Sequence, residues 1–410
     1  MAPRTKRKRY DEYDFQPATK LEKESWNGFC EIESEPALFN VMLREFGVKG
    51  VKVQEVVSLD EEMMAFLNKP IYGLIFLFRW QADDPKKQEA SCPEGIWFAN
   101  QTASNACASV ALLNIVNNIP DIDLGEKLQH FKEFTMPFTP ALRGDAINNF
   151  EFVKRVHNSF ARYACSIPLL CWRTNLRDRK MDILNSDLQL KYEATSKKST
   201  KKGEIDDSDS FHFIAFMPSM GQVWKFDGLD RQPQALGEYF KGDWLEIAKP
   251  NILDRMAAYE EDQIEFSILG LVQDPLTDLI QQLAVNVKRL EIVNGQLKHS
   301  GPEFESMLSE PNDTVMGPDL SFELTRTAID LAISPSTLPI HSTEQLLKDW
   351  QKLRDDQRQL RIRIREEQQL HRADEDHATG RRYDYGPAVR TWLQFLARKR
   401  QLADLLQMRQ

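Results

Sequence analysis

The stretch that follows Cys107 constrains the fold of this chain more than any other. Residues 106–118 carry apolar side chains on nearly every side of the helix that their pattern predicts. A helix without a polar face has to be covered all round, because water would otherwise meet its apolar surface. Residues 96–99 are expected to form a short strand that leads into it. The sequence therefore predicts an α/β domain with this helix inside the core.

Cys107 stands at the start of that helix, six residues after Gln101. The N-terminus of a helix offers unpaired N–H groups and partial positive charge, which favour the nucleophilic thiolate. The side-chain amide of Gln101 can donate to the oxyanion that forms when a thiolate attacks a carbonyl. Asn105 is expected to be the N-cap of the helix. These residue types indicate a thiol hydrolase. A buried structural cysteine is the alternative, because free cysteines are commonly buried.

A second segment offers the base that a cysteine nucleophile needs. Two strand patterns, joined by an expected four-residue turn, lie between Phe211 and Asp227. If Met217 pairs with Gln222, His212 lies directly opposite Asp227, with the two Cβ atoms about 5 Å apart. The carboxylate then orients the imidazole, as in a catalytic triad. A core histidine and a turn-forming Asp-Gly pair are the alternatives.

His157 is the other histidine that could act as a base. It lies within a helical pattern at 151–162, without a carboxylate at helix or strand spacing. We therefore expect a packing or surface role for His157.

Composition narrows the class of protein. The chain has 410 residues, a net charge of −9 and 41% hydrophobic residues. Such an acidic chain lacks the basic face that broad nucleic-acid binding needs, whereas it suits a basic substrate surface. The five cysteines form no C-x-x-C pair, which fits free thiols in a reducing compartment and argues against structural zinc. The sequence shows no signal peptide and no apolar run of membrane-spanning length.

At these residues the chain resembles the ubiquitin carboxyl-terminal hydrolases, which are papain-like cysteine deubiquitinases. The resemblance rests on the motifs around Cys107 and His212 and covers roughly residues 25–273. The matching stretches are Asn100-Gln101, Asn105-Ala106-Cys107-Ala108, Phe211-His212-Phe213, Phe226-Asp227-Gly228-Leu229, Trp26, Glu31-Ile32-Glu33-Ser34, Phe46-Gly47-Val48-Lys49-Gly50-Val51, Tyr72–Phe78, Ile122-Asp123-Leu124-Gly125 and Ile264–Leu269.

The resemblance implies both a fold and a mechanism. The fold is a central, antiparallel-rich sheet flanked by helices, with a knotted backbone, followed by a helical tail domain. Cys107 is implied to be the nucleophile, Gln101 the oxyanion donor, His212 the base and Asp227 its orienting residue. The implied reaction is hydrolysis of the amide or isopeptide bond after the C-terminal glycine of ubiquitin, and it requires no cofactor and no metal.

We expect three regions along the chain. A disordered, basic N-terminus covers 1–24, the catalytic domain covers 25–273, and a helical domain covers 274–410. Within the catalytic domain, the charged stretch 193–210 corresponds to a loop that crosses the active-site cleft in the family. Lys6-Arg7-Lys8-Arg9 in the N-terminus has the composition of a nuclear import signal, and a solvated charge run is the alternative.

The helical domain carries patterns typical of packed helices. From Leu276 to Leu290, apolar residues recur at intervals of three and four, which predicts a seam for another helix. A short helix is expected at 320–333, a long one at 344–372, and the segment 383–406 has a broad apolar face. In the long-tailed family members that the chain resembles, the tail binds an adaptor, and segment 343–410 is its counterpart here.

The identity of the protein that binds the tail distinguishes two possible pathways. By resemblance to the proteasome-associated ubiquitin hydrolase, the adaptor is a proteasome ubiquitin receptor. By resemblance to the polycomb-type histone H2A deubiquitinase, it is a chromatin protein. A non-catalytic, ubiquitin-binding scaffold is a third possibility, against which the four filled site positions argue. We expect the proteasomal pathway, a location in nucleus and cytoplasm, and no direct nucleic-acid or membrane partner.

Overall fold

The computed structural model describes most of the catalytic domain and most of the helical domain. The expected N-terminus 1–24, the crossover stretch 193–210 and most of 383–406 lie outside the described residues. Described are residues 28–79, 84–103, 105–160, 211–240, 244–257, 266–300, 314–333 and 342–382, together with 391–392, 394–396 and 398.

The catalytic domain is built on a six-stranded sheet with the strand order β1-β6-β2-β3-β4-β5. Every pair of neighbouring strands is antiparallel, which confirms the expected sheet. The strands are β1 (Val51–Glu55), β2 (Ile71–Arg79), β3 (Phe211–Ser219), β4 (Gln222–Phe226), β5 (Gln234–Glu238) and β6 (Ser267–Gln273).

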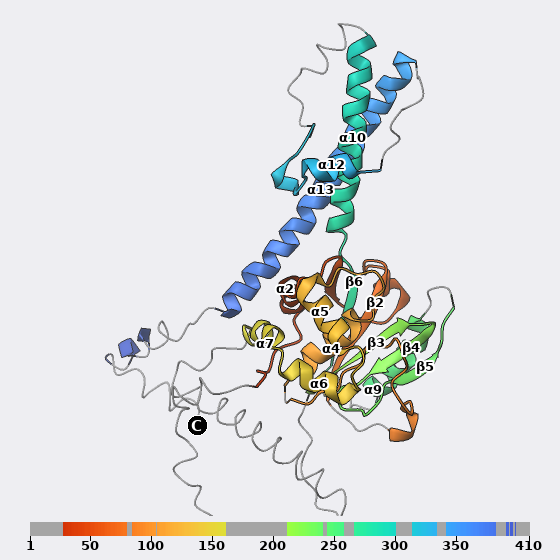
Figure 1. The fold of residues 1–410 in the computed structure, drawn as a ribbon. Coiled ribbons are helices and arrows are strands. Elements are labelled where there is room, and N and C mark those ends of the chain that lie inside the picture. Colours follow the sequence, from red (N-terminus) through yellow and green to blue (C-terminus); the bar gives the residue numbers. More distant parts are fainter. Residues whose placement is uncertain are drawn as a thin grey trace, which may run out of the picture.

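Helices cover both faces of this sheet (Figure 1). On β3, Phe213 and Ala215 enter the core on one face, while Ile214 and Phe216 enter the core on the other. Because both faces are buried, β2 carries the uninterrupted apolar run that the sequence shows. The first core is covered by α2 (Pro36–Phe46), α4 (Cys107–Val116), α5 (Gly125–Thr135), α6 (Pro140–Asn148) and α7 (Glu151–Asn158), and the second by α3 (Glu61–Met64) and α9 (Leu245–Ala257).

The segment 96–99, expected as a strand, is buried but pairs with no strand of the described chain. Two asparagines, Asn114 of α4 and Asn118 in the turn after it, take the place of a neighbouring strand. Asn118 accepts from the N–H of Trp97 at 2.8 Å and donates to its carbonyl at 2.7 Å. Asn114 binds Ala99 in the same way, at 2.8 and 3.2 Å. Asn114 and Asn118 are four residues apart, a rise of about 6 Å along helical backbone. Trp97 and Ala99 are two residues apart, about 6.6 Å along extended backbone, so the two spacings match.

Asn40 of α2 uses the same device at the edge of the sheet. Its amide accepts from the N–H of Val53 at 2.6 Å and donates to the carbonyl of Val53 at 3.2 Å. An edge strand otherwise presents unpaired backbone groups, so this contact closes the edge at β1. The alternating pattern of Val51, Val53 and Val57 predicts a strand over 51–57 with these valines on its buried face. The observed strand ends at Glu55, and Val57 is 76% exposed, so this prediction was too long at its end.

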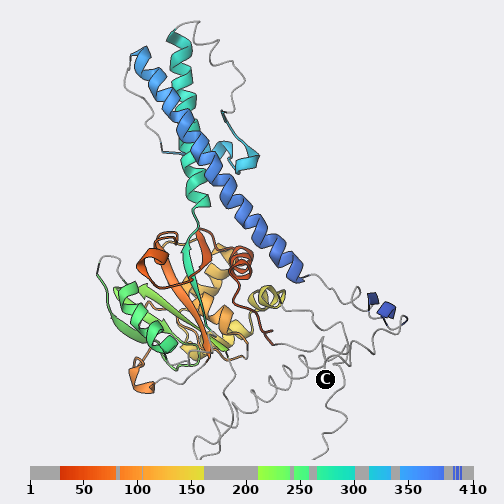
Figure 2. The ribbon, with the colours of Figure 1, turned by 180° about the vertical axis from the view of Figure 1, so that it is seen from behind.

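The predicted seam is confirmed in the helical arm, where α10 (Leu276–Ser300) packs along α13 (Thr343–Arg382) (Figures 1 and 2). Helix α13 continues past Arg372, where the sequence predicts its end. Apolar residues from both helices fill the interface: Leu276, Leu279, Leu283, Val287, Leu290, Val293 and Leu297 from α10, and Leu346, Trp350 and Ile364 from α13.

The segment between these two helices differs from the single helix expected at 320–333. It forms a 3-10 turn, η4 (Leu320–Phe322), and a short helix, α12 (Arg326–Leu331). Glu323 interrupts the helix because its φ of 56° is left-handed. Among the described residues, no helix has the length and apolar character needed to cross a bilayer.

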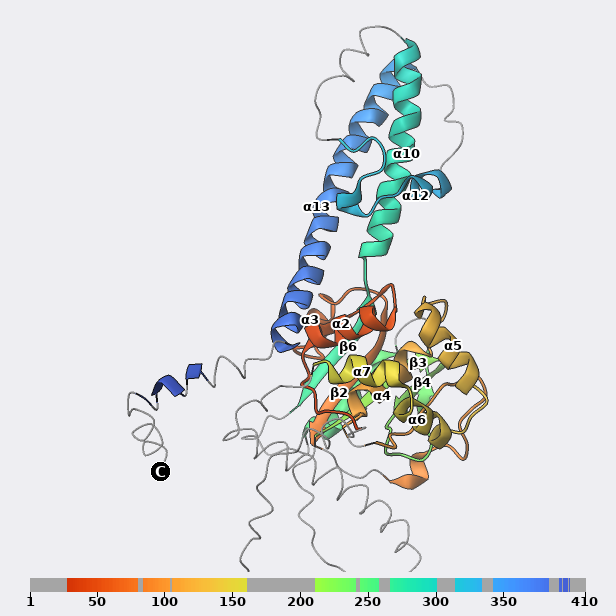
Figure 3. The same cartoon turned by 60° about the vertical axis from the view of Figure 1, so that its left-hand side comes forward.

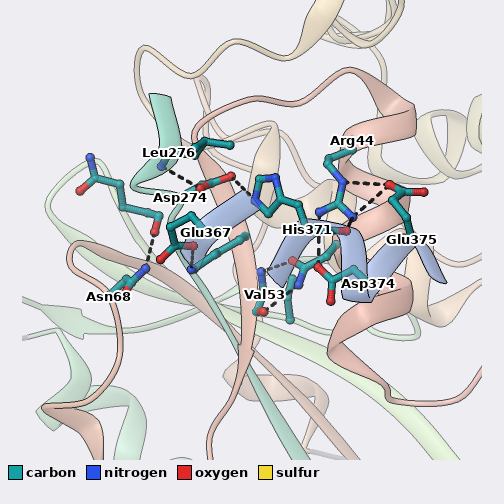
Figure 4. A network of polar contacts seen from close by, with 12 residues as sticks. Arg44, Val53, Asn68, Asp274, Leu276, Glu367, His371, Asp374 and Glu375 are labelled. Atoms are coloured by element: carbon teal, nitrogen blue, oxygen red, sulfur yellow. Dashed lines mark hydrogen bonds and ion pairs between the residues drawn. The ribbon is translucent and has the colours of Figure 1, made fainter. Parts of the chain in front are cut away.

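The C-terminal half of α13 returns to the catalytic domain and lies beside α2 (Figure 3). We call this contact the α13 junction. Ion pairs dominate it, and Ala378 is the α13 residue that reaches the catalytic core. Figure 4 shows its central part. The pairs are Lys52–Glu367, Asp274–His371, Arg44–Asp374, Arg44–Glu375, Glu35–His377, Glu33–Arg381 and Glu45–Arg382.

Candidate active site

Strands β3 and β4 form a hairpin whose turn is shorter than predicted. Ser219 pairs with Gln222, so the turn consists of Met220 and Gly221. Both have positive φ angles, 53° and 78°, as a two-residue hairpin turn of type I′ requires. The predicted four-residue turn was wrong, and the predicted pairing of Met217 with Gln222 was wrong by two residues.

This shift nevertheless leaves His212 and Asp227 close together. Side chains alternate with a period of two, so a shift of two residues keeps the same face, whereas a shift of one exchanges the faces. Ala215 pairs with Phe226, the last residue of β4, and Asp227 follows it. His212 is therefore a diagonal neighbour of Asp227, a separation that side chains can bridge. The Nε2 atom of His212 lies 2.7 Å from Oδ1 of Asp227.

The environment of this pair favours a charged imidazole. Both residues are 3% exposed. Burial alone would lower the pKa of His212, but the charge and hydrogen bond of Asp227, with a contribution from Cys107, raise it to about 9. Burial would raise the pKa of Asp227, but His212, the N–H of Leu229 and the charge of Lys225 lower it. The pair thus holds a proton on the imidazole and a negative charge on the carboxylate near neutral pH.

Cys107 is the first residue of α4 and is partly exposed. Hydrogen bonding and charge from its thiol help to raise the pKa of His212, so the thiol lies beside the ring, and because Nε2 faces Asp227, Nδ1 is the nitrogen left for the thiol. The predicted N-cap was wrong by one residue. Ala106 is the N-cap, without a side-chain bond to the helix, whereas Asn105 has a φ of 59° and donates to the carbonyl of Phe29 at 3.3 Å. Asparagine tolerates this left-handed backbone better than most residues.

Gln101 lies against the loop that follows Asp227. Its backbone N–H donates to the carbonyl of Gly228 at 2.8 Å. A Cβ atom on Gly228 would lie 3.1 Å from the backbone nitrogen of Gln101, so a glycine permits this close approach. The side-chain amide of Gln101 donates to the carbonyl of Ala103 at 3.0 Å, and its buried Oε1 atom has no hydrogen-bond partner among the described residues. The amide therefore lies at the start of the loop to Cys107.

Asn100 supports the same loop, a role that the sequence did not indicate. Its Nδ2 donates to the carbonyl of Asp230 at 2.6 Å and lies 3.4 Å from the carbonyl of Gly228. The residue stands next to Gln101 in the family motif, and that adjacency was the available signal. Asn100 ties the segment before Cys107 to the segment after Asp227.

His157 has the packing role that we expected, although it is fully buried. Burial lowers its pKa to about 4, against which a hydrogen bond with the carbonyl of Cys30 acts. Its Nδ1 lies 2.8 Å from Oγ of Ser109 on α4, and its Nε2 lies 2.7 Å from that carbonyl. A neutral histidine between two helices and the N-terminal segment connects α7 to α4.

One group of described residues, Asp274, Glu367 and His371, has the ligand types and spacing of a metal site. Its charges are already balanced by protein groups. The Nζ atom of Lys52 lies 2.6 Å from Glu367, and His371 lies 3.1 Å from Asp274. A lysine ammonium at this position would repel a divalent cation. We assign the group to the α13 junction.

Comparisons with known proteins agree with the geometry. Residues 29–257 match the family model "Ubiquitin carboxyl-terminal hydrolase, family 1". The Dictyostelium discoideum protein "Ubiquitin carboxyl-terminal hydrolase isozyme L5" is 36% identical over 262 residues, which cover 64% of this chain and 67% of the relative. "Ubiquitin carboxyl-terminal hydrolase ubh-4" of Caenorhabditis elegans is 34% identical over 305 residues, 74% of this chain and 81% of the relative.

Two further matches each cover 60% of this chain. "Ubiquitin carboxyl-terminal hydrolase BAP1" of Xenopus tropicalis is 29% identical over 264 residues, 60% of this chain and 34% of the relative. A crystal structure of the Trichinella spiralis UCH37 catalytic domain bound to ubiquitin vinyl methyl ester is 33% identical, with a TM-score of 0.46 over 60% of this chain and 96% of that one.

The family match covers more than half of the chain, and it includes Gln101, Cys107, His212 and Asp227. The chain therefore belongs to the family 1 ubiquitin carboxyl-terminal hydrolases, which are cysteine-type deubiquitinases.

Proposed function

We propose that Cys107, His212, Asp227 and Gln101 carry out the hydrolysis of the bond after the C-terminal glycine of ubiquitin. The observation that carries this assignment is the connected line from the Cys107 thiol through the His212 ring to Asp227. A nucleophile bonded to a base, and a base bonded to an orienting carboxylate, is the arrangement of a covalent hydrolase.

The assignment gives each residue one task. The Cys107 thiolate attacks the carbonyl carbon of the scissile bond and forms a tetrahedral intermediate. The amide of Gln101 and the backbone N–H of Cys107 donate to its oxyanion. The His212 imidazolium protonates the leaving amine, which departs and leaves a thioester on Cys107. Neutral His212 then takes a proton from water, which hydrolyses the thioester, while Asp227 keeps the ring in place.

Labelling with ubiquitin vinyl methyl ester tests the assignment. We expect mass spectrometry to find the adduct on Cys107 and no adduct on the variant Cys107→Ala. Cys92 is the matched control, because it is also partly exposed, and burial raises the pKa of its thiol against the lowering effect of Arg143. Labelling of Cys92, or of Cys107→Ala, would contradict the proposed nucleophile. Absence of any labelling would favour the non-catalytic scaffold.

We further propose that the tail recruits the enzyme to the proteasome through an adaptor, in nucleus and cytoplasm. Beyond α13, Trp392 and Phe395 are 58% and 53% exposed. Large exposed aromatic side chains are typical anchors of an interface. Two relatives with the name of isozyme L5 or ubh-4 match across most of their length, which supports this pathway. Similarity to BAP1 keeps a chromatin pathway as the second candidate.

Affinity purification with the full chain tests the adaptor and separates the two pathways. We expect proteasome subunits to be enriched, and the double change Trp392→Ala and Phe395→Ala to remove them. Truncation after Arg382 should have the same effect, because it removes both aromatic residues. It also keeps α13 on the catalytic domain. Truncation after Ser342 is less informative, since it would expose the apolar seam of α10. Chromatin factors in place of proteasome subunits would favour the second candidate.

A further inference from the structure

Lys225 is an unusual residue at the centre of a buried strand. It lies on β4, is 2% exposed, and its Nζ atom is 3.1 Å from Oδ2 of Asp230. A buried ion pair adds little to stability on average, because the desolvation of both charges offsets their attraction. Apolar residues of similar volume could fill the same place. The pair therefore invites a functional explanation.

The position of Lys225 makes it a competitor for the carboxylate that His212 uses. Lys225 lies on β4, and Asp227 is two residues further on, directly after the end of the strand. Residues at this spacing share a face where the backbone stays extended. Burial would raise the pKa of Asp227, and the charges of His212 and Lys225 lower it, so the lysine is within electrostatic range. An ammonium without its own counter-ion would be drawn toward Asp227.

Asp230 is well placed to prevent this. Its backbone N–H donates to the carbonyl of Asp227 at 3.0 Å and closes a turn between the two acids. Its carbonyl accepts from Asn100 at 2.6 Å, and its Oδ1 accepts from Gln88 at 3.0 Å. These bonds fix the Asp230 carboxylate, so its second oxygen, Oδ2, faces Lys225. The turn places one carboxylate at the imidazole and the other at the lysine.

We propose that Asp230 is a positioning residue for hydrolysis: as the counter-ion of Lys225, it reserves Asp227 for His212. The inference rests on the proposed roles of His212 and Asp227. Neither Lys225 nor Asp230 takes part in bond making. Their effect is to keep Asp227 bonded to one cation, the imidazolium, instead of shared between two.

Three variants test this inference in the full chain. In Asp230→Asn, Lys225 turns to Asp227, and we expect kcat with a ubiquitin C-terminal reporter to fall by about 10- to 100-fold with little change in KM. The alkaline limb of the pH–rate profile should move to lower pH, because a shared Asp227 stabilises the imidazolium less. Lys225→Met should have a smaller effect, since it removes the competitor. The double variant Lys225→Met, Asp230→Asn should recover kcat and the pH limb relative to Asp230→Asn.

The rescue separates this role from a purely structural one. If Asp230 only stabilised the turn, the double variant would be at least as impaired as Asp230→Asn. Such a result, or a folded Asp230→Asn with wild-type kcat and pH profile, would overturn the inference. Thermal melting checks each variant, and Asp230→Ser replaces Asp230→Asn if the latter does not fold. Glu367→Gln is the matched control, because it breaks the similar Lys52 pair at the α13 junction and should leave the pH profile unchanged.

The same series separates failure of the inference from failure of the proposed function. Wild-type protein that is not labelled on Cys107 by ubiquitin vinyl methyl ester would remove the basis of both. Wild-type protein that is labelled and active, combined with unaffected Asp230 variants, would overturn the positioning role alone.

Discussion

Two histidine–carboxylate pairs of this molecule share their chemistry and differ in their surroundings. The distance between His212 and Asp227 is 2.7 Å, and each side chain is 4% exposed. The distance between His371 and Asp274 at the α13 junction is 3.1 Å, and these side chains are 20% and 12% exposed. The first pair is buried inside the catalytic domain, whereas the second joins α13 to the surface of that domain.

The third group beside each histidine decides what the pair can do. His212 is bonded to the Cys107 thiol, so a proton shift on its ring can drive chemistry. Near His371 stand Glu367 and Lys52, which form an ion pair with each other. A buried charge pair keeps its full electrostatic strength, while a partly exposed one is screened by water and salt. Burial and the neighbouring thiol, more than the pair itself, thus distinguish a candidate catalytic histidine from a structural one.

The largest effect should come from the group that only the first pair possesses. We expect Cys107→Ala to abolish turnover of a ubiquitin C-terminal reporter, because Cys107 is the nucleophile of the proposed covalent step. Binding of ubiquitin, measured by calorimetry, should remain close to wild type, since the thiol contributes little contact area. Appreciable turnover by this variant would show that the chemistry lies elsewhere and would break the comparison.

Loss of the buried carboxylate should have the next largest effect. We expect Asp227→Asn to lower kcat by roughly 10⁴-fold, as loss of the orienting carboxylate does in a serine-protease triad. In the wild type, the alkaline limb of the pH–rate profile should lie near pH 9, where His212 loses its proton. In Asp227→Asn the limb should move to lower pH, because burial then acts on the imidazole without its counter-charge.

The same pKa has a consequence for stability, whose sign follows from linkage. The pKa of His212 is raised in the folded state from an ordinary value of 6.5 to about 9. Its protonation therefore stabilises the fold fully below about pH 6.5, and this contribution is lost as the pH rises through 9.

Asp274→Asn, at the α13 junction, is the control for the pH–rate profile. It should leave the alkaline limb of that profile unchanged. A shift of the limb in that variant would contradict the distinction between the two pairs.

Gln101→Ala should have the third largest effect on kcat. The loss of one oxyanion donor typically lowers kcat by roughly 10²- to 10³-fold, or about 2.7–4 kcal/mol of transition-state stabilisation. In the resting structure one N–H of the amide donates to the carbonyl of Ala103, and its second N–H is the donor left for the oxyanion. Single-turnover kinetics should show a slower acylation step with an unchanged pH profile. An altered pH profile would mean that Gln101 acts through His212 instead.

The parts of the fold that depend on local periodicity were predictable from the sequence. Pro36 and Gly47 indicate a helix over 36–46, because proline favours the first turn and glycine the position just past the end, and α2 has these bounds. The seam of α10 followed from its intervals of three and four. The break at Glu323 was not predictable, since it depends on a positive φ at a residue that rarely has one.

The parts that depend on distant partners were missed or only approximated. Residues 96–99 have a strand pattern, and only their contacts with Asn114 and Asn118 show that α4 and the turn after it take the place of a neighbouring strand. The four residues of the site were singled out by residue type and spacing, and the family motif then implied their roles. The hairpin register that joins two of them was wrong by two residues, an error that by parity left both on one face.

The smallest effect should come from the exposed pair, and it tests the comparison from the other side. We expect His371→Ala to lower the free energy of unfolding by about 1 kcal/mol or less, because partly exposed ion pairs are weak. The loss should shrink in about 1 M salt, where the screening length falls to about 3 Å.

The same pair should also make stability depend on pH. Burial would raise the pKa of Asp274, and its bonds with His371 and the N–H of Leu276 lower it. In the wild type this carboxylate therefore contributes stability that is present above its ordinary pKa and is lost as the pH falls through the lowered value. Thermal melts of His371→Ala against pH should show less of this acid-dependent loss, while kcat for the reporter stays at the wild-type level. Lys348→Ala, which breaks an exposed pair within α13 alone, controls for helix stability. A tenfold fall in kcat for His371→Ala, with no matching fall for Lys348→Ala, would show that the α13 junction is coupled to Cys107. The pair at the junction would then contribute to catalysis, and the distinction between the two pairs would be wrong.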